Sequence, residues 1–327
     1  MKIYFYSTKK YDQEYFLKQN SSHELTFSDY QLNKDTAVLA KAYDAVCIFV
    51  NDICDAEVLS ILSSIGIKSI LLRCAGFNNV DLDKAKQLGI KVVRVPAYSP
   101  FSVAEHTLAL LLCLNRKIHK AYNRVKEGNF NIEGLEGFDL HQKTIGIVGF
   151  GNIGKAFAQI ISGFGGQILI YDPFAEEANM PKNSKSVSLE TLLKESDIIS
   201  LHCPLTTDTK YIIDDKALSI VKPSAYIINT SRGALVDTQA IIKALKSKAI
   251  AGLAIDVYEY EKDIFFKDMS GEIIADDIFE RLLSFPNVLI TAHQAFLTKE
   301  ALNGIASTTL DNASSLENTD SCENLVL

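Results

Sequence analysis

The segment Ile145–Gly154, which reads IGIVGFGNIG, decides the fold of this chain. It opens with an apolar run typical of a buried strand. Gly149, Gly151 and Gly154 then form a G-x-G-x-x-G pattern, and the last glycine stands at the start of a stretch with helical spacing. A helix N-terminus that follows a glycine loop favours a pyrophosphate, because its free N–H groups and its dipole attract an anion. The segment therefore predicts a dinucleotide-binding unit.

Each glycine of this loop has its own task. Gly149 permits the tight turn, Gly151 lets the backbone approach the phosphates, and Gly154 lets helix and strand pack closely. After the next predicted strand comes Asp172, at the position where an acid binds the ribose hydroxyls. A carboxylate there would repel a 2′-phosphate, so the sequence predicts NAD rather than NADP.

Two other interpretations use the same residues. Gly149–Lys155 also matches GxxxxGK, the start of a loop that binds nucleoside triphosphates, but Ala156 follows where Mg²⁺ needs a Ser or Thr hydroxyl. The loop could also be a glycine-rich turn with a purely structural role. The strand, the helix and Asp172 all fall in register, and together they favour the dinucleotide.

Composition excludes several classes of protein. The 327 residues, of which 47% are apolar and 22% charged, indicate a globular chain with about two domains. The longest strongly apolar stretch, Leu108–Leu114, is far shorter than the roughly 18 residues of a membrane span. A net charge of −7 without any basic run argues against nucleic acid. The six cysteines lack CxxC spacing and no export signal is evident, so we expect a cytoplasmic protein without a metal site or disulfides.

Apolar runs alternate with amphipathic stretches along the chain, which predicts an α/β fold with parallel sheets. Pro96 and Pro100 interrupt regular structure, and a long helix is expected after them, at 102–119. The amphipathic stretch 299–316 is expected to return to the first part of the chain. We predict a discontinuous domain, 1–100 plus 297–327, and a second domain, 101–296. Strands are predicted at 3–6, 45–50, 70–73, 91–95, 144–148, 167–171, 198–201, 226–229, 252–256 and 288–291.

Three titratable side chains follow predicted strands of the second series, at the end of a parallel sheet where ligands bind. Arg232 could grip a carboxylate with two hydrogen bonds, His293 could donate a proton near neutral pH, and Glu261 could orient His293. Taken singly, each residue type at such a position more often has a surface or loop role, and spacing alone does not show that the three meet. A structural or surface role is expected for the remaining histidines considered: His106, His119, His141 and His202.

A set of motifs in a fixed order resembles the D-2-hydroxyacid dehydrogenases over essentially the whole chain. Besides the glycine loop, the motifs are RCAGFNNVD at 73–81, VPAYSP at 95–100, AEH at 104–106, LHCPLT at 201–206, NTSRGALVD at 229–237, DVYE at 256–259 and TAHQAF at 291–296. Within this family the likeness is greatest to the bacterial fermentative D-lactate dehydrogenases. One departure is Phe150, where Thr or Leu is common, at a position whose side chain is not needed for the phosphate contact.

The resemblance implies two Rossmann-like parallel-sheet domains, one flavodoxin-like and one dinucleotide-binding, with a cleft between them. It gives Arg232, Glu261 and His293 catalytic roles. Substrate contacts are implied for the backbone of Ala75 and Gly76, for Arg232 and His293, and for Tyr98 and Phe296 as pocket walls. Besides the three glycines, implied cofactor contacts are Asn152, Ile153, Asp172, Cys203, Pro204, Thr230, Ser231 and Asp256.

The implied activity is the reversible, NADH-dependent reduction of pyruvate to D-lactate, with His293 as the proton donor. Two alternatives stay open: another 2-oxo acid as substrate, and a non-catalytic NAD-sensing protein, against which the presence of Arg232, Glu261 and His293 argues. A homo-oligomer, dimer or tetramer, is also expected, because helix 102–116 carries more apolar surface than one core needs and because the family forms such assemblies.

Overall fold

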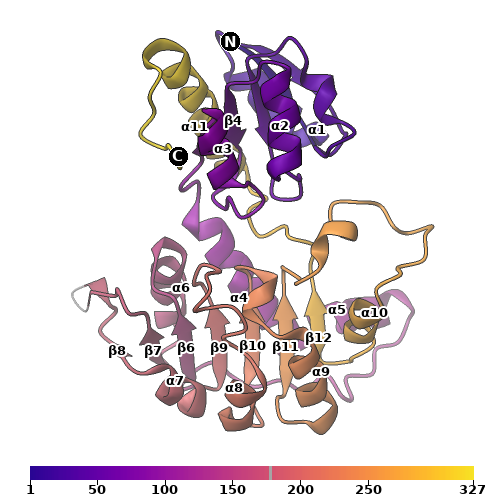
Figure 1. The fold of residues 1–327 in the computed structure, drawn as a ribbon. Coiled ribbons are helices and arrows are strands. Elements are labelled where there is room, and N and C mark those ends of the chain that lie inside the picture. Colours follow the sequence, from indigo (N-terminus) through magenta and orange to yellow (C-terminus); the bar gives the residue numbers. More distant parts are fainter. Residues whose placement is uncertain (177–178) are drawn as a thin grey trace. The chain divides into compact units, whose positions relative to one another are not determined.

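The structure is a computed structural model that describes residues 1–176 and 179–327 (Figure 1). The chain divides into two compact units, described separately below. Unit 1 comprises Met1–Ser99 and Leu297–Leu327, and unit 2 comprises Pro100–Phe296. Each unit is built on a wholly parallel sheet with helices between successive strands, so the predicted α/β class is confirmed.

Unit 1 contains a five-stranded sheet with the order β2-β1-β3-β4-β5. Its elements are β1 (Lys2–Phe5), α1 (Lys10–Gln19), β2 (Glu24–Phe27), the 3₁₀ helix η1 (Ala37–Ala40), β3 (Ala45–Ile48), α2 (Ala56–Ser64), β4 (Ser69–Leu72), α3 (Leu82–Leu88), β5 (Lys91–Arg94) and α11 (Lys299–Thr319). Strand β2 was not predicted. It lies at the sheet edge and no residue in it is fully buried, so it lacks the continuous apolar run that marks a central parallel strand.

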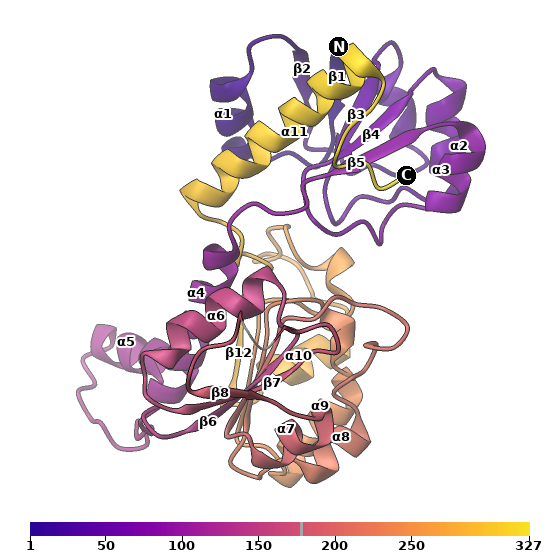
Figure 2. The ribbon, with the colours of Figure 1, turned by 90° about the vertical axis from the view of Figure 1, so that its left-hand side faces the viewer.

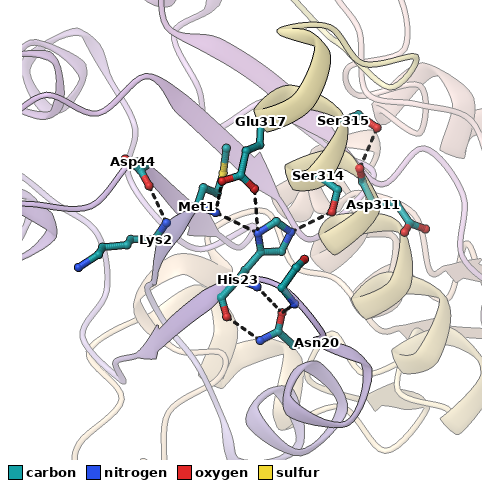
Figure 3. Close-up of polar contacts among 10 residues, drawn as sticks. Met1, Lys2, Asn20, His23, Asp44, Asp311, Ser314, Ser315 and Glu317 are labelled. Carbon is teal, nitrogen blue, oxygen red and sulfur yellow. Dashed lines mark hydrogen bonds and ion pairs between the residues drawn. The ribbon is translucent and has the colours of Figure 1, made fainter.

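Helix α11 brings the C-terminal part of the chain onto unit 1, along the sheet and beside α1 (Figure 2). Polar contacts tie it to the start of the chain (Figure 3). The amino group of Met1 lies 2.5 Å from Glu317 Oε1, and the Nε2 atom of His23 lies 2.9 Å from Ser314 Oγ. Burial lowers the pKa of His23. The stretch 299–316 was therefore correctly expected to pack on the first part of the chain.

Unit 2 contains a seven-stranded sheet with the order β12-β11-β10-β9-β6-β7-β8. Its elements are α4 (Pro100–Arg116), α5 (Ile118–Lys126), β6 (Thr144–Val148), α6 (Asn152–Ser162), β7 (Gln167–Tyr171), β8 (Ser184–Ser186), α7 (Leu189–Glu195), β9 (Ile198–Leu201), α8 (Asp215–Ile220), β10 (Tyr226–Asn229), η3 (Gly233–Leu235), α9 (Thr238–Ser247), β11 (Gly252–Ile255), η4 (Glu261–Asp263), α10 (Asp277–Leu283) and β12 (Val288–Ile290). The polar edge strand β8 was not predicted, for the same reason as β2.

Apolar side chains cover both faces of this sheet. One cluster joins the strands to α4 and α6, and another joins them to α7, α8, α9 and α10. The central strands are buried on both faces, which is why they appear in the sequence as unbroken apolar runs. The chain order reverses between β6 and β9, and this switch point places the loops after these strands beside each other at one edge.

The helix predicted at 102–119 is in fact two helices. Lys117 adopts a left-handed conformation (φ +51°), which ends α4 and begins α5 in a new direction. Helix α4 buries eight residues against α6 and the sheet, whereas α5 buries none. Helical spacing cannot reveal such a break, because Lys117 is a common residue in helix interiors. Within the described residues, none of the helices combines the length and apolarity that crossing a membrane requires.

Candidate active site

The glycine loop after β6 has the geometry that the sequence predicts. Gly149 has φ +93°, and a Cβ atom there would lie 2.4 Å from the backbone nitrogen of Cys203. A Cβ at Gly154 would lie 2.2 Å from the carbonyl oxygen of Gly149, so only glycine lets α6 approach the strand. At Gly151, the N-cap of α6, a Cβ would meet nothing within 4 Å. The open side of the loop at Gly151 and the start of α6 fit a bound pyrophosphate.

Asp172 lies directly after β7 and is fixed against this loop. Its carboxylate accepts hydrogen bonds from the backbone N–H groups of Phe150 (2.6 Å) and Phe174 (2.8 Å), one on each oxygen. Each carboxylate oxygen keeps a further lone pair for a ribose hydroxyl. The acid therefore stands beside the phosphate-binding turn, as a dinucleotide requires.

The loops after β9 and β10 are joined beside the glycine loop. The Ser231 hydroxyl donates to the carbonyl of Cys203 (2.7 Å), and the Thr230 hydroxyl lies 2.8 Å from that of Thr107 on α4. Burial raises the pKa of the Cys203 thiol to about 11, so it is an unreactive neutral thiol near pH 7. Pro204 lies in the loop after β9 and is exposed, whereas Asn152 and Ile153 are the first residues of α6 and are exposed and half-buried, respectively.

His293 and Glu261, far apart in the sequence, form a direct hydrogen bond. The Nδ1 atom of His293 lies 2.7 Å from Oε1 of Glu261, and the other carboxylate oxygen accepts from the backbone N–H of Tyr258 (2.9 Å). The two side chains are 14% and 21% exposed, so the pair is sheltered yet open to a small ligand. With Nδ1 engaged by the carboxylate, Nε2 is the ring nitrogen left for a ligand.

Arg232 stands at the end of β10, next to the segment that carries Glu261. A Cβ at the following residue, Gly233, would lie 2.1 Å from the backbone carbon of Tyr258, so the two loops touch through this glycine. The backbone of Arg232 is held by Asn229, whose side chain donates to the Arg232 carbonyl (2.8 Å). The half-buried guanidinium donates one hydrogen bond, to the Ser231 carbonyl (2.8 Å), and has further N–H groups for a ligand.

The Asp256 carboxylate is fully buried and supports the loop that carries His293. It accepts hydrogen bonds from the backbone N–H groups of Gln294 (2.9 Å) and Ala295 (2.8 Å) and from the Thr291 hydroxyl (2.5 Å). Burial alone would raise the pKa of Asp256, but hydrogen bonds from His106, Thr291 and the two amides outweigh burial and lower it. The cofactor contact that the sequence predicts for Asp256 stays a prediction.

His106, for which the sequence predicts a structural or surface role, has partners that the sequence did not indicate. Its Nε2 atom lies 3.1 Å from the Thr291 hydroxyl and 3.4 Å from the Asp256 carboxylate. These contacts are compatible with a structural role, and they arise because α4 packs against strands β10, β11 and β12. No spacing in the sequence links His106 to Asp256; the AEH motif was the one available signal.

The predicted substrate residues of unit 1 lie in the loops after β4 and β5. The carbonyl of Ala75 accepts from the Arg94 guanidinium (2.9 Å), and the carbonyl of Gly76 accepts from the Cys74 thiol (3.2 Å). Tyr98 is half-buried, in the segment after β5. Phe296 is the last residue of unit 2 and is buried.

Unit 2 thus combines a dinucleotide cradle with an imidazole–carboxylate pair and an arginine at one edge of its sheet. An imidazole can move the proton of a hydroxyl or carbonyl, and an arginine can hold a carboxylate beside it. No cluster of metal-binding side chains is found among residues 1–176 and 179–327. Such a site defines a nicotinamide-dependent dehydrogenase of the class that acts on hydroxy acids.

Comparison with known proteins agrees with this class. Residues 108–295 match the family model of the D-isomer specific 2-hydroxyacid dehydrogenases, NAD binding domain. The chain is 51% identical over 326 residues to D-lactate dehydrogenase of Escherichia coli, covering 99% of both chains, and 50% identical over 329 residues to a 2-hydroxyacid dehydrogenase homolog of Haemophilus influenzae, covering 100% of this chain and 99% of that one.

Solved structures give the same result. The apo structure of the E. coli D-lactate dehydrogenase superposes with a TM-score of 0.91 at 49% identity and full coverage of both chains. The Lactobacillus jensenii D-lactate dehydrogenase with NAD⁺ superposes with a TM-score of 0.82 at 33% identity, again with full coverage. The chain therefore belongs to the D-isomer specific 2-hydroxyacid dehydrogenase family, and its cofactor is NAD.

Proposed function

We propose that this protein is a D-lactate dehydrogenase that reduces pyruvate reversibly to D-lactate. The observation that carries the proposal is the 2.7 Å hydrogen bond between His293 and Glu261 on an NAD-binding sheet, since a binding protein that only senses NAD needs no such pair. The relatives about half identical over nearly the whole chain include D-lactate dehydrogenases, which favours pyruvate among 2-oxo acids.

In this mechanism three side chains act beside the bound cofactor. Bound NADH supplies the hydride that reduces the ketone carbon. Arg232 holds the pyruvate carboxylate and offsets the charge that develops on the ketone oxygen. His293, protonated on Nε2, gives its proton to that oxygen as the hydroxyl forms. Glu261 keeps the imidazole oriented through Nδ1 and stabilises its charged form.

The proposal also assigns contacts with the cofactor and with the substrate. Around the cofactor, it uses the three loop glycines with Asn152, Ile153, Asp172, Cys203, Pro204, Thr230, Ser231 and Asp256. Around the substrate, it uses the Ala75 and Gly76 backbone, Tyr98 and Phe296. The carbonyls of Ala75 and Gly76 are already bonded within unit 1, which fixes the orientation of the backbone on which these contacts depend.

A panel of 2-oxo acids tests the proposal. Purified protein with NADH is given pyruvate, glyoxylate, hydroxypyruvate and 2-oxoisocaproate, and NADH oxidation is followed by absorbance. We expect the highest kcat/KM with pyruvate, and D-lactate as the product when it is assayed with enantiomer-specific reagents. A preference for another acid would support the alternative that the protein reduces a different 2-oxo acid. NADH binding without turnover of any acid would support the alternative of a non-catalytic NAD-sensing protein.

We also propose a homo-oligomer located in the cytoplasm, with α5 at the interface. The apolar surface expected on α4 is buried against α6. Instead, Ile118, Tyr122 and Val125 of α5 are each more than half exposed, and they are spaced to share one helix face. An exposed apolar face of this kind marks an interface. Light scattering should give a mass above 36.1 kDa, and Tyr122→Glu should lower it.

A further inference from the structure

The backbone of His293 has an unusual conformation that contacts from its surroundings must stabilise. Its φ is +53°, in the left-handed region that residues with a side chain rarely occupy. Such a conformation persists where surrounding contacts over-determine it. The contacts come from Asp256, whose carbonyl accepts from the N–H of His293 (2.7 Å) and whose carboxylate accepts from the N–H groups of Gln294 and Ala295.

The Asp256 carboxylate is itself part of a chain of hydrogen bonds that begins on α4. The Thr291 hydroxyl donates its single proton to Asp256 Oδ1 (2.5 Å). The oxygen of this hydroxyl therefore accepts from His106 Nε2 at 3.1 Å, which places a proton on that nitrogen. The direction of the chain is fixed: His106 donates to Thr291, and Thr291 donates to Asp256.

His106 also affects the free-energy cost of burying the Asp256 carboxylate. A carboxylate with 0% exposure is costly unless opposite charge or hydrogen bonds compensate it. Among the partners that the described part of the chain gives Asp256, His106, at 3.4 Å from Oδ1, is the side chain that can carry a positive charge. Its own exposure is 17%, and it lies on the well-packed helix α4, so it is held in place from outside the loop.

We propose that His106 is a positioning residue for the reaction, which holds the loop 291–295, and with it the imidazole of His293, through Thr291 and Asp256. The inference rests on the proposed dehydrogenase function. His106 does not touch the reacting atoms. It acts by keeping the Asp256 carboxylate oriented, so that the N–H groups of Gln294 and Ala295 stay bound to it and the adjacent His293 keeps its left-handed backbone.

Two variants separate this role from simple packing. His106→Phe keeps a planar ring on α4 but lacks the donor, and His106→Gln keeps an N–H donor at a similar reach. We expect His106→Phe to lower kcat for pyruvate by about tenfold or more, with the Kd for NADH unchanged, because the proton donor is misplaced while the glycine loop is intact. His106→Gln should restore most of kcat. His141→Phe is the matched control, since His141 lies just before β6 and bonds the backbone carbonyl of Phe164 after α6 (2.9 Å).

Hydrogen exchange supplies a readout that does not need turnover. The amides of residues 293–295 should exchange faster in His106→Phe than in the wild type and in His106→Gln, and amides of α4 should be unaffected. Thr291→Val, which removes only the hydroxyl, should reproduce the faster exchange, and it serves in place of His106→Phe if that variant does not fold.

Equal kcat and equal exchange in the wild type, His106→Phe and Thr291→Val would overturn the proposal. So would a loss in His106→Phe that His106→Gln does not reverse, because packing alone would explain it. A wild type that turns over no 2-oxo acid refutes the proposed function, and the exchange comparison still decides whether His106 holds the loop.

Discussion

The glycine loop after β6 and the loop 291–295 after β12, called the histidine loop below, both place a residue at positive φ. They stabilise this conformation in opposite ways. Each follows a strand of one parallel sheet, and each contains a residue with positive φ, Gly149 at +93° and His293 at +53°. The glycine loop reaches its shape because side chains are absent. The histidine loop reaches it because Asp256, supported by Thr291 and His106, binds three consecutive residues of the loop.

This difference decides where each loop is vulnerable. In the glycine loop, the damaging change is an added atom, because the neighbouring backbone lies within 2.2–2.4 Å of a new Cβ at Gly154 or Gly149. In the histidine loop, the damaging change is a removed atom, because distant side chains hold the loop.

Removal of the imidazole should have the largest effect. We expect His293→Ala to lower kcat for pyruvate by roughly 10² to 10⁴, the usual contribution of a positioned proton donor, and to leave the Kd for NADH nearly unchanged. Single-turnover kinetics and fluorescence titration with NADH measure the two quantities. A normal kcat would remove His293 from the mechanism.

Arg232→Lys keeps the charge but removes the two-pronged geometry. We expect the KM for pyruvate to rise and kcat to fall, with kcat/KM lower by about 10-fold to 100-fold, because one charge-assisted hydrogen bond is lost. Steady-state kinetics with saturating NADH give both constants. An unchanged KM would mean that the guanidinium does not hold the carboxylate.

Two glycine variants should separate folding from cofactor binding. Gly154→Ala places a Cβ 2.2 Å from the Gly149 carbonyl, so we expect a loss of about 1–3 kcal/mol in the free energy of unfolding. Gly151→Ala meets nothing within 4 Å and has an ordinary φ of −70°, so it should fold normally and bind NADH more weakly, by about tenfold. Urea unfolding and NADH titration distinguish them. Equal stability of both variants would contradict the packing argument.

Glu261→Gln retains the hydrogen bond to His293 but removes the negative charge. The imidazolium that donates the proton then loses its neighbouring carboxylate. We expect kcat for pyruvate to fall while the Kd for NADH stays unchanged, as measured by single-turnover kinetics and NADH titration. An unchanged kcat would mean that Glu261 does not act through His293.

A second histidine, His202, lies beside the glycine loop and should affect the pH dependence of stability. His202 lies against Phe157, under the glycine loop. Its Nε2 atom lies 2.8 Å from the Ser200 hydroxyl, and burial lowers its pKa from 6.5 to about 3. In the unfolded chain the imidazole binds a proton as the pH falls below about 6.5, whereas in the folded protein it stays neutral until about pH 3. Its contribution to stability is therefore complete above pH 6.5 and is lost as the pH falls through this range.

We expect the free energy of unfolding of the wild type to decrease from pH 7 to pH 5 by about 2 kcal/mol more than that of His202→Asn. Urea unfolding at the two pH values measures this difference. His141→Asn, at a histidine with an exposed side chain, is the control and should keep the wild-type dependence. An identical dependence in wild type and His202→Asn would show that His202 is not held neutral.

The sequence by itself determined the α/β class and most of the central strands, because a strand buried on both faces must be a continuous apolar run. It also located the glycine loop, whose function is encoded in consecutive residues. The sequence did not predict the edge strands β2 and β8 or the break at Lys117. Edge strands bury little, and a left-handed lysine leaves no pattern in the sequence.

The contacts between side chains from distant parts of the chain became visible in the folded structure alone. Arg232, Glu261 and His293 were chosen from the sequence because they follow strands, but their spacing could not show a contact, and the 2.7 Å bond between His293 and Glu261 required the fold. His106 escaped notice because α4 precedes the sheet and reaches its far end only in three dimensions. A site made of backbone is local in the chain and can be found in the sequence. A site made of side chains from three separate elements exists only once the sheet has brought the ends of its strands together.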